Sequence, residues 1–326
     1  MKAKRIAINT LKSLILPVFV YLLFLILSGG RFGNWNSMFA IFRQVVYPAV
    51  VAWAICNNQT MGVWDFTPGS IILLSGILGG TLADRWGLGV WGMVGIIILT
   101  CAACTLLNCT VFTFCKIPSM IAGLGMLMIY ESVGATIFQG GGVSISRKWT
   151  FFAKSPYVFI ILVLCFICIY YINNYTKFGY DVRSLGNATH IAKNIGVNLI
   201  KTRYKSFLLE GVLFGVASVV NISIQGAAKP ETGMATTSIA FSAIMAVMVG
   251  RYLSKYCDLL VGTMLGALTL KMLTSGMLAA GLKSEAQQIG NGVFLILFLA
   301  ISLNQYKIFE LRERRKKREA ILKRAE

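Results

Sequence analysis

Three acidic residues and one histidine are the side chains of this 326-residue chain best placed to do chemistry. Asp65 lies between two long apolar runs, Glu131 and Glu210 lie within such runs, and His190 is the single histidine. The motifs that would bring such groups together for catalysis do not occur: there is no His-Glu-x2-His, no Gly-x-Ser-x-Gly and no Gly-x4-Gly-Lys-Ser/Thr loop. We therefore expect no enzyme activity, and no cofactor or metal bound by this chain.

Two cysteine pairs have the spacing of metal and redox motifs. Cys101 and Cys104 are separated by two residues, as are Cys165 and Cys168. All four lie inside apolar runs without a nearby histidine, and hydrocarbon disfavours the thiolates that zinc requires. We interpret them as small packing residues.

Composition indicates a membrane protein. Hydrophobic residues make up 56% of the chain and charged residues only 13%, whereas a soluble domain has roughly a quarter charged. Apolar runs of about 20 residues, each long enough to cross a bilayer, recur along the chain. We predict an all-α, polytopic integral membrane protein, with a transmembrane domain over 1–304 and a basic cytoplasmic tail over 305–326. The predicted spans are about ten: 13–30, 39–56, 68–83, 89–110, 119–138, 155–174, 206–225, 234–250, 259–280 and 286–304.

The net charge of +19 indicates orientation rather than nucleic-acid binding, because the basic residues lie at loop ends and not along one face. They are most frequent in the segment 177–205 and in the tail. Because cytoplasmic loops carry an excess of Lys and Arg, we predict that both termini are cytoplasmic, in the cell membrane of a prokaryote.

The segment 57–70 cannot be one continuous helix, because it contains Gly62, Pro68 and Gly69. One interpretation is a bend at the inner mouth of a solute path, with Asp65 or Thr67 capping the helix that follows. The other is an ordinary connecting loop in which the acid is only a helix cap.

Glu131 is the acid placed deepest within a predicted span. It either lines a solute path or pairs with a neighbour such as Arg43, for which we favour a position near the outer boundary, with the side chain reaching the interface. Glu210 lies one turn into its span and is expected to reach the cytoplasmic interface.

The segment 177–205 is the one long polar interruption. Asn187 is predicted to cap a short helix over 188–195, which Gly196 ends in a left-handed conformation. A helix of two turns is not stable alone in water, so it should lean on something. A docking element for a soluble partner and a solvated, charged loop both fit this pattern.

Three glycine pairs at four-residue spacing predict close helix packing. They are Gly76 with Gly80, Gly211 with Gly215, and Gly262 with Gly266.

Three stretches in matching order resemble the ribose/galactose-type permease family of ABC importers. They are GVWDFTPGS at 62–70, KIPSMIAGLGM at 116–126, and a series made up of Phe178-Gly179, Leu185-Gly186-Asn187, Ala192 and Ile195-Gly196-Val197-Asn198. The chain departs from the family pattern at Phe66-Thr67-Pro68, at Glu131-Ser132 and over 249–256. It resembles a divergent member.

The resemblance implies a permease subunit for a sugar or sugar-like solute. A second permease subunit, identical or a sister chain, would pair with it, a partner ATPase would bind ATP and Mg²⁺, and an extracytoplasmic binding protein would deliver the solute. No nucleic acid is implied. The short helix would be the coupling helix that contacts the ATPase, through Gly186, Asn187, His190, Ala192, Lys193, Ile195 and Gly196. Asp65, Thr67, Pro68, Gly69 and Glu131 would lie along the path or its gate.

A stand-alone secondary transporter or channel is the alternative. Such proteins often contain repeated broken helices with buried ion ligands, and only the 57–70 break is evident here. A membrane-embedded enzyme would need a nucleophile or metal set that the sequence does not show.

Overall fold

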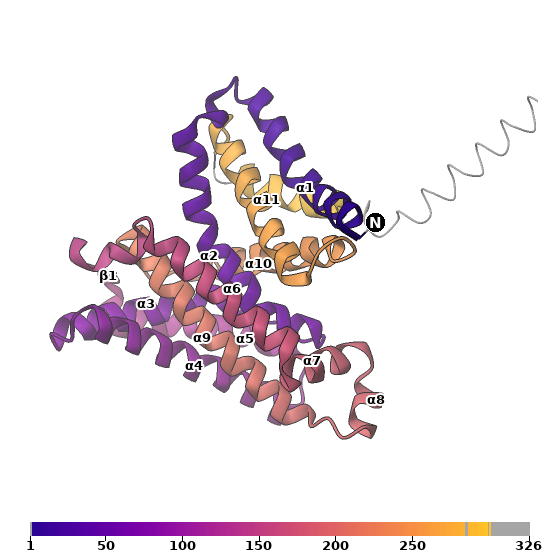
Figure 1. Cartoon of the computed structure of the whole chain (residues 1–326). Helices are drawn as coiled ribbons and strands as arrows, with labels where there is room; N and C mark the ends of the chain where they lie inside the picture. The colour runs from indigo at the N-terminus through magenta and orange to yellow at the C-terminus, as the bar shows by residue number, and fades with distance from the viewer. Residues whose placement is uncertain (1, 284–285, 299, 301–326) are drawn as a thin grey trace, which may run out of the picture.

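The structure, a computed structural model, describes residues 2–283, 286–298 and 300, and most of them are helical (Figure 1). The helices are α1 (Lys2–Leu27), α2 (Trp35–Thr60), α3 (Pro68–Arg85), α4 (Gly89–Cys115), α5 (Ser119–Thr136), α6 (Tyr157–Tyr175), α7 (Lys177–Asn187), α8 (Thr189–Asn194), α9 (Leu199–Gln225), α10 (Thr237–Leu253), α11 (Leu259–Ala279) and a final described helix, Ala286–Phe298. Three short 3₁₀ turns lie at Arg31–Gly33, Ile137–Gly140 and Arg147–Ala153. The predicted tail, 305–326, lies outside the described residues.

Six of the described helices are long and apolar enough to cross a membrane: α2, α4, α5 with its 3₁₀ extension, α6, α9 and α11. The most apolar stretches of α2, α9 and α11 are mostly buried, whereas only 22% and 17% of those of α4 and α6 are buried. Exposed apolar helix faces are what a bilayer covers. The prediction of a multi-pass helical membrane protein is confirmed.

The glycine pairs bring helices close together, as their spacing predicted. A Cβ atom at Gly211 or Gly215 would overlap α4, and one at Gly262 or Gly266 would overlap α10. Backbones therefore approach closely at α4–α9 and at α10–α11. Gly80 contacts the side chain of Val143 instead of a helix.

The two ends of the bundle are built differently. In Figure 1, α3 to α6 and α9 run side by side, with β1 near one end and α7 and α8 at the other. Strands β1 (Val143–Ser144) and β2 (Ala227–Ala228) pair antiparallel, with Val143 opposite Ala228, and they tie the α5–α6 connection to the α9–α10 connection. The predicted docking segment is therefore at the end opposite the strands.

Candidate functional site

Helices α7 and α8 form a hairpin with a buried foot. Val182, Leu185 and Ala192 are buried in a small apolar cluster with Met61 and Phe207. Within α7, the buried positions recur at intervals of three residues, which places them on one helix face. The cluster supplies the support that a two-turn helix needs, and it places the hairpin against the end of α2.

Gly186 sets how closely the hairpin approaches α2. A Cβ atom at this position would overlap the carbonyl oxygen of Thr60, the last residue of α2. Only glycine allows the two backbones to meet at this distance.

The predicted cap of the short helix is wrong. Asn187 is the last residue of α7, and the N-cap position of α8 is Ala188, whose side chain makes no capping hydrogen bond. The apolar face of α7 extends the first helix through Asn187, so the chain turns one residue later than predicted. The stop is confirmed: Gly196 has a φ of 88° and donates its N–H to the Lys193 carbonyl over 3.0 Å.

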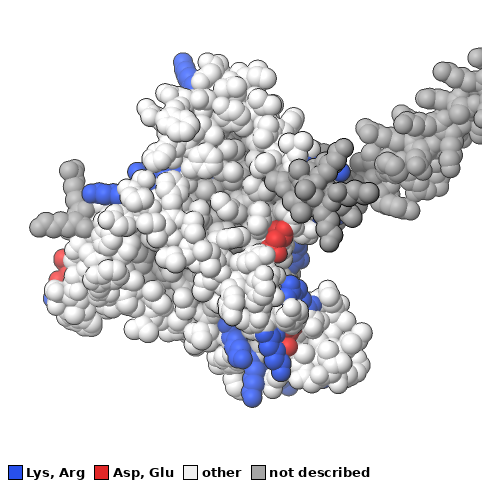
Figure 2. Space-filling model, viewed as in Figure 1, with Lys and Arg blue, Asp and Glu red and all other residues white. Residues whose placement is uncertain are grey.

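The far side of the hairpin is exposed. Of the seven residues predicted to contact an ATPase, Ala192 is buried, at 1% exposure, and the other six are exposed. Ile191 and Ile195 are 62% and 70% exposed. Figure 2 shows Lys and Arg side chains gathered over this end of the molecule. The hairpin tip therefore offers apolar side chains within a basic surface.

A second set of contacts links the hairpin to α11. Arg183 donates to the Asn173 carbonyl over 2.9 Å and to Asn174 Oδ1 over 3.2 Å. Asn174 in turn donates to Asp258 Oδ2 over 3.4 Å, and Asp258 Oδ1 accepts from the Leu260 N–H at the start of α11. The hairpin therefore touches the end of α2 and, through these bonds, the beginning of α11.

The break before α3 is held by a chain of hydrogen bonds that we call the buried polar network. Asp65 Oδ1 accepts from the Thr67 N–H and hydroxyl, at 2.8 and 2.7 Å. Thr67 Oγ1 accepts from Asn108 of α4 over 2.8 Å, and Asn108 Oδ1 accepts from the Tyr130 hydroxyl of α5 over 2.9 Å. Thr67 holds the N-cap position of α3, but its own side chain does not cap the helix. Asp65, 5% exposed, instead accepts from the backbone of Thr67.

Asp65 lies in the connection between α2 and α3. Burial raises the pKa of its carboxyl group above the ordinary value, and the hydrogen bonds from Thr67 partly offset that rise.

Glu131, which follows Tyr130 on α5, makes a second set of buried hydrogen bonds, to the start of α10, and we include it in the buried polar network. Its carboxylate accepts from the Met234 N–H over 2.8 Å and from the Thr236 N–H and hydroxyl, at 3.0 and 2.7 Å. A Cβ atom at Gly69 would overlap the Thr236 carbonyl, so the beginnings of α3 and α10 meet here. The sequence suggested Arg43 as a partner of Glu131. Glu131 instead accepts hydrogen bonds from residues at the start of α10. The structure thus brings the predicted path residues together, but Asp65, Thr67, Pro68, Gly69 and Glu131 are all buried.

Glu210 does not reach the interface, contrary to expectation. Its side chain is fully buried in α9 and accepts a hydrogen bond from Asn58 of α2. A buried carboxylate needs a hydrogen-bond donor, because it has left the water that would otherwise solvate it. Asn58, near the end of α2, provides that donor inside the protein.

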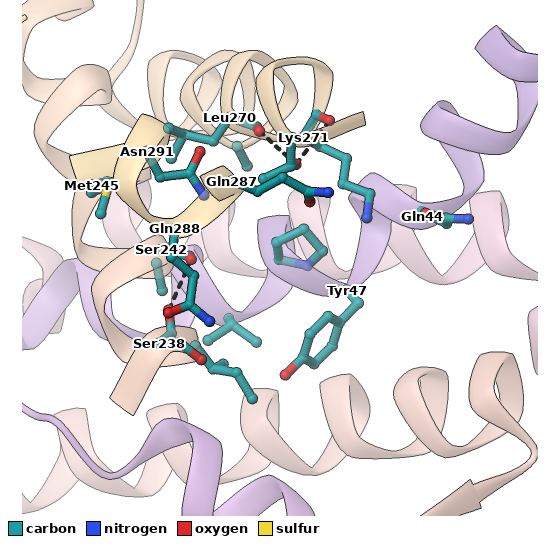
Figure 3. A pocket seen from close by; sticks show the side chains of 16 residues that line it. Gln44, Tyr47, Ser238, Ser242, Met245, Leu270, Lys271, Gln287, Gln288 and Asn291 are labelled. Atoms are coloured by element: carbon teal, nitrogen blue, oxygen red, sulfur yellow. Dashed lines mark hydrogen bonds between the residues drawn. The ribbon is translucent and has the colours of Figure 1, made fainter. Parts of the chain in front are cut away.

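A cavity of about 400 Å³ lies among α2, α10, α11 and the helix Ala286–Phe298 (Figure 3). Its lining includes Tyr47, Ser242, Lys271, Gln287 and Asn291. Cavities of this size hold small molecules in other proteins. Sequence reasoning missed this site, because its residues come from four separate segments. The available signal was Lys271, the one charged residue within the apolar helix α11.

A multi-pass helical body with an exposed hairpin at one end and a small cavity among the helices is the architecture expected of a membrane permease. Residues 37–302 match the family described as "Branched-chain amino acid transport system / permease component". The chain belongs to this family. It is a divergent member of the sugar-type permeases and a permease subunit of an ABC importer, as the motifs predicted.

The chain is also similar to individual proteins of known sequence or structure. The chain is 23% identical, over 90% of its length and 92% of theirs, to the autoinducer 2 import system permease protein LsrD of Yersinia pseudotuberculosis and of Yersinia pestis. A solved inward-facing metal-chelate type ABC transporter is similar over 89% of this chain and 98% of its own, with 16% identity and a TM-score of 0.48.

Proposed function

We propose that this chain, paired with a second permease subunit, imports a sugar-like solute, and that a cytoplasmic ATPase drives it through the α7–α8 hairpin. ATP and Mg²⁺ are bound by the ATPase, and an extracytoplasmic binding protein delivers the solute. The LsrD relatives add autoinducer 2 as one candidate solute.

The observation that carries this proposal is the double attachment of the hairpin. Its foot meets the end of α2 at Gly186, and Arg183 joins it, through Asn174, to Asp258 at the start of α11. Both α2 and α11 line the cavity shown in Figure 3. A push on the exposed tip therefore acts on two walls of the cavity, and such rigid-body motion is a common way to alternate access.

The orientation follows from charge. The hairpin end carries a concentration of basic residues (Figure 2), and basic loops face the cytoplasm. With ten crossings, both termini are cytoplasmic. Ten crossings would use the six long helices together with the 18-residue α3 and the shorter apolar helices Leu11–Leu27, Thr237–Leu253 and Ala286–Phe298. In a prokaryote the membrane is the cell membrane.

The test is to make the hairpin tip acidic without disturbing its foot. Ile191→Asp combined with Ile195→Asp changes two exposed side chains, so folding and membrane insertion should be retained. The ATPase should no longer co-purify with the variant, and ATP-dependent uptake into proteoliposomes should be lost.

Leu88→Asp is the matched control, because Leu88 is an exposed apolar residue in the turn between α3 and α4. This variant should retain both properties. Normal co-purification of the ATPase with the doubly acidic tip would contradict the docking role. Uptake that persists without any ATPase would favour a secondary transporter.

A further inference from the structure

Lys271 lies too far inside α11 for its side chain to reach the water beyond the end of the helix. It lies eight residues before the end of α11, more than two turns, and is the only charged residue of that helix. An ionisable residue within a membrane-spanning helix is costly and faces protein or a water-filled cavity. In Figure 3 its side chain extends from α11 across the cavity toward α2.

Lys271 is the one charged residue among the described residues that line the cavity. Among the described residues that line the cavity there is no Asp or Glu. The ammonium group makes no hydrogen bond or ion pair to another part of the described chain, while the Lys271 carbonyl accepts from the Thr274 hydroxyl over 3.1 Å. The described lining of the cavity therefore carries one basic side chain and no acidic one.

The remaining polar groups of the wall are neutral. The amides of Gln287 and Gln288 carry both donors and acceptors, although Gln287 Nε2 already donates to the Leu282 carbonyl. The Ser242 hydroxyl donates to the Ser238 carbonyl and offers only an acceptor. Tyr47 and Asn291 each carry an oxygen that is shielded from solvent and has no hydrogen-bond partner in the described chain. Buried polar atoms are normally paired, so this wall has spare hydrogen-bonding capacity. Neutral amides and hydroxyls arranged on a partly apolar wall suit a compact molecule with several hydroxyl groups.

The cavity lies at the middle of α2 and mainly in the half of α11 that leads to the turn at Gly281, away from the hairpin. In the proposed orientation it extends from the middle of the membrane into the outer half, from which a delivered solute would enter.

We propose that this cavity is a solute site for a polyol that carries one negative charge, with Lys271 as its counter-ion. The inference rests on the proposed import function, and it narrows the solute class from neutral sugars to anionic sugar derivatives.

The test measures the charge preference of the cavity without transport. In the assembled complex, Ser242→Cys places a thiol on the cavity wall. The rates at which it reacts with an anionic sulfonatoethyl and a cationic trimethylammonioethyl methanethiosulfonate are followed by peptide mass spectrometry. Each rate is divided by that of the same reagent with free cysteine. One uncompensated charge nearby should favour the anionic reagent by about fivefold.

Two further variants assign the preference to Lys271. Lys271→Gln should bring the ratio to about one, and Lys271→Arg should retain it, because only the former removes the charge. Equal rates in the parent variant, or a preference that survives in Lys271→Gln, would overturn the proposal. Lack of reaction with either reagent would also overturn it, since a partner chain or lipid would then fill the cavity.

A matched pair of probes tests whether a polyol binds in the cavity and whether its binding depends on a negative charge. Gluconate and glucitol share a hydroxylated six-carbon chain, but only gluconate carries a carboxylate. Gluconate should slow the labelling of the thiol at position 242 more than glucitol does, and Lys271→Gln should abolish the difference. Equal protection, or none, would refute an anionic polyol site. ATP-dependent uptake by the same preparation is measured separately, so failure of the import function is distinguishable from failure of this site.

Discussion

The α7–α8 hairpin and the buried polar network are both rich in polar residues, but they use them in opposite ways. The hairpin is anchored by apolar side chains, and most of its polar residues, including His190 and Lys193, are exposed. In the buried polar network, Asp65 and Glu131 are buried; Asp65 accepts hydrogen bonds from Thr67, and Glu131 accepts them from the start of α10. Both regions combine polar residues with glycine and resemble functional motifs in the sequence. In the hairpin, apolar contacts hold the segment, so its polar side chains remain free to meet a partner. In the buried polar network, the polar side chains themselves hold the segments and are not available to a partner.

This comparison predicts that changes at the hairpin affect coupling, whereas changes in the buried polar network affect stability. The largest effect is expected at the foot of the hairpin. Gly186→Val should lower ATP-dependent uptake by about tenfold or more. The valine side chain would overlap the Thr60 carbonyl and displace the hairpin. Small displacements of a positioned group reduce the rates of other proteins by such factors. Uptake by proteoliposomes and co-purification of the ATPase measure it.

Gly125→Ala is the control for Gly186→Val, since a Cβ atom at Gly125 meets no other atom within 4 Å. It should leave uptake unchanged. Normal uptake by Gly186→Val would show that the foot of the hairpin does not need its close approach to α2.

The next effect is expected in the buried polar network. Glu131→Ala should lower the free energy of unfolding by about 2–4 kcal/mol, because the buried donors of Met234 and Thr236 lose their acceptor. Thermal unfolding of the purified complex measures the loss. Glu131→Gln, which keeps one acceptor oxygen, should lose less. If Glu131→Ala retained full stability and lost only transport, the residue would belong to the solute path and the comparison would fail.

A smaller effect is expected at the end of α8. Gly196 has a φ of 88°, and a Cβ atom there meets nothing within 4 Å, so the requirement is conformational and not steric. Gly196→Val should cost about 1–2 kcal/mol locally and reduce uptake severalfold while membrane insertion stays normal. Gly196→Asn should be milder, because asparagine tolerates positive φ. Uptake assays on both variants provide the check, and equal uptake by the two would argue against a conformational role.

The smallest effect is expected at the hairpin surface. His190→Ala removes an exposed side chain and should change uptake by less than about twofold, within the usual range for a surface position. A large loss of uptake with the ATPase still bound would identify His190 as a specific contact and sharpen the account of the tip.

Much of this fold follows from local sequence. Runs of about 20 apolar residues predicted the membrane helices, since length and hydrophobicity alone decide whether a segment can cross a bilayer. The pair Gly211 and Gly215 predicted close packing, and Gly196 predicted a left-handed helix end. Asn187 was misassigned because the apolar face of α7 repeats at only a few positions, and packing of that face against the end of α2 extends the helix through this residue.

The sequence by itself therefore determined the class of the protein, the position of its hairpin and the break before α3, because each depends on neighbouring residues. Only the tertiary structure decided which residues share a site. It joined Glu131 to the start of α10, buried Glu210 beside Asn58, and placed Lys271 in one cavity with Tyr47 and Asn291. Such groupings arise when helices from distant parts of the sequence pack together. A charged side chain within these helices must face a partner or a cavity, and the neighbouring residues in the sequence do not specify which.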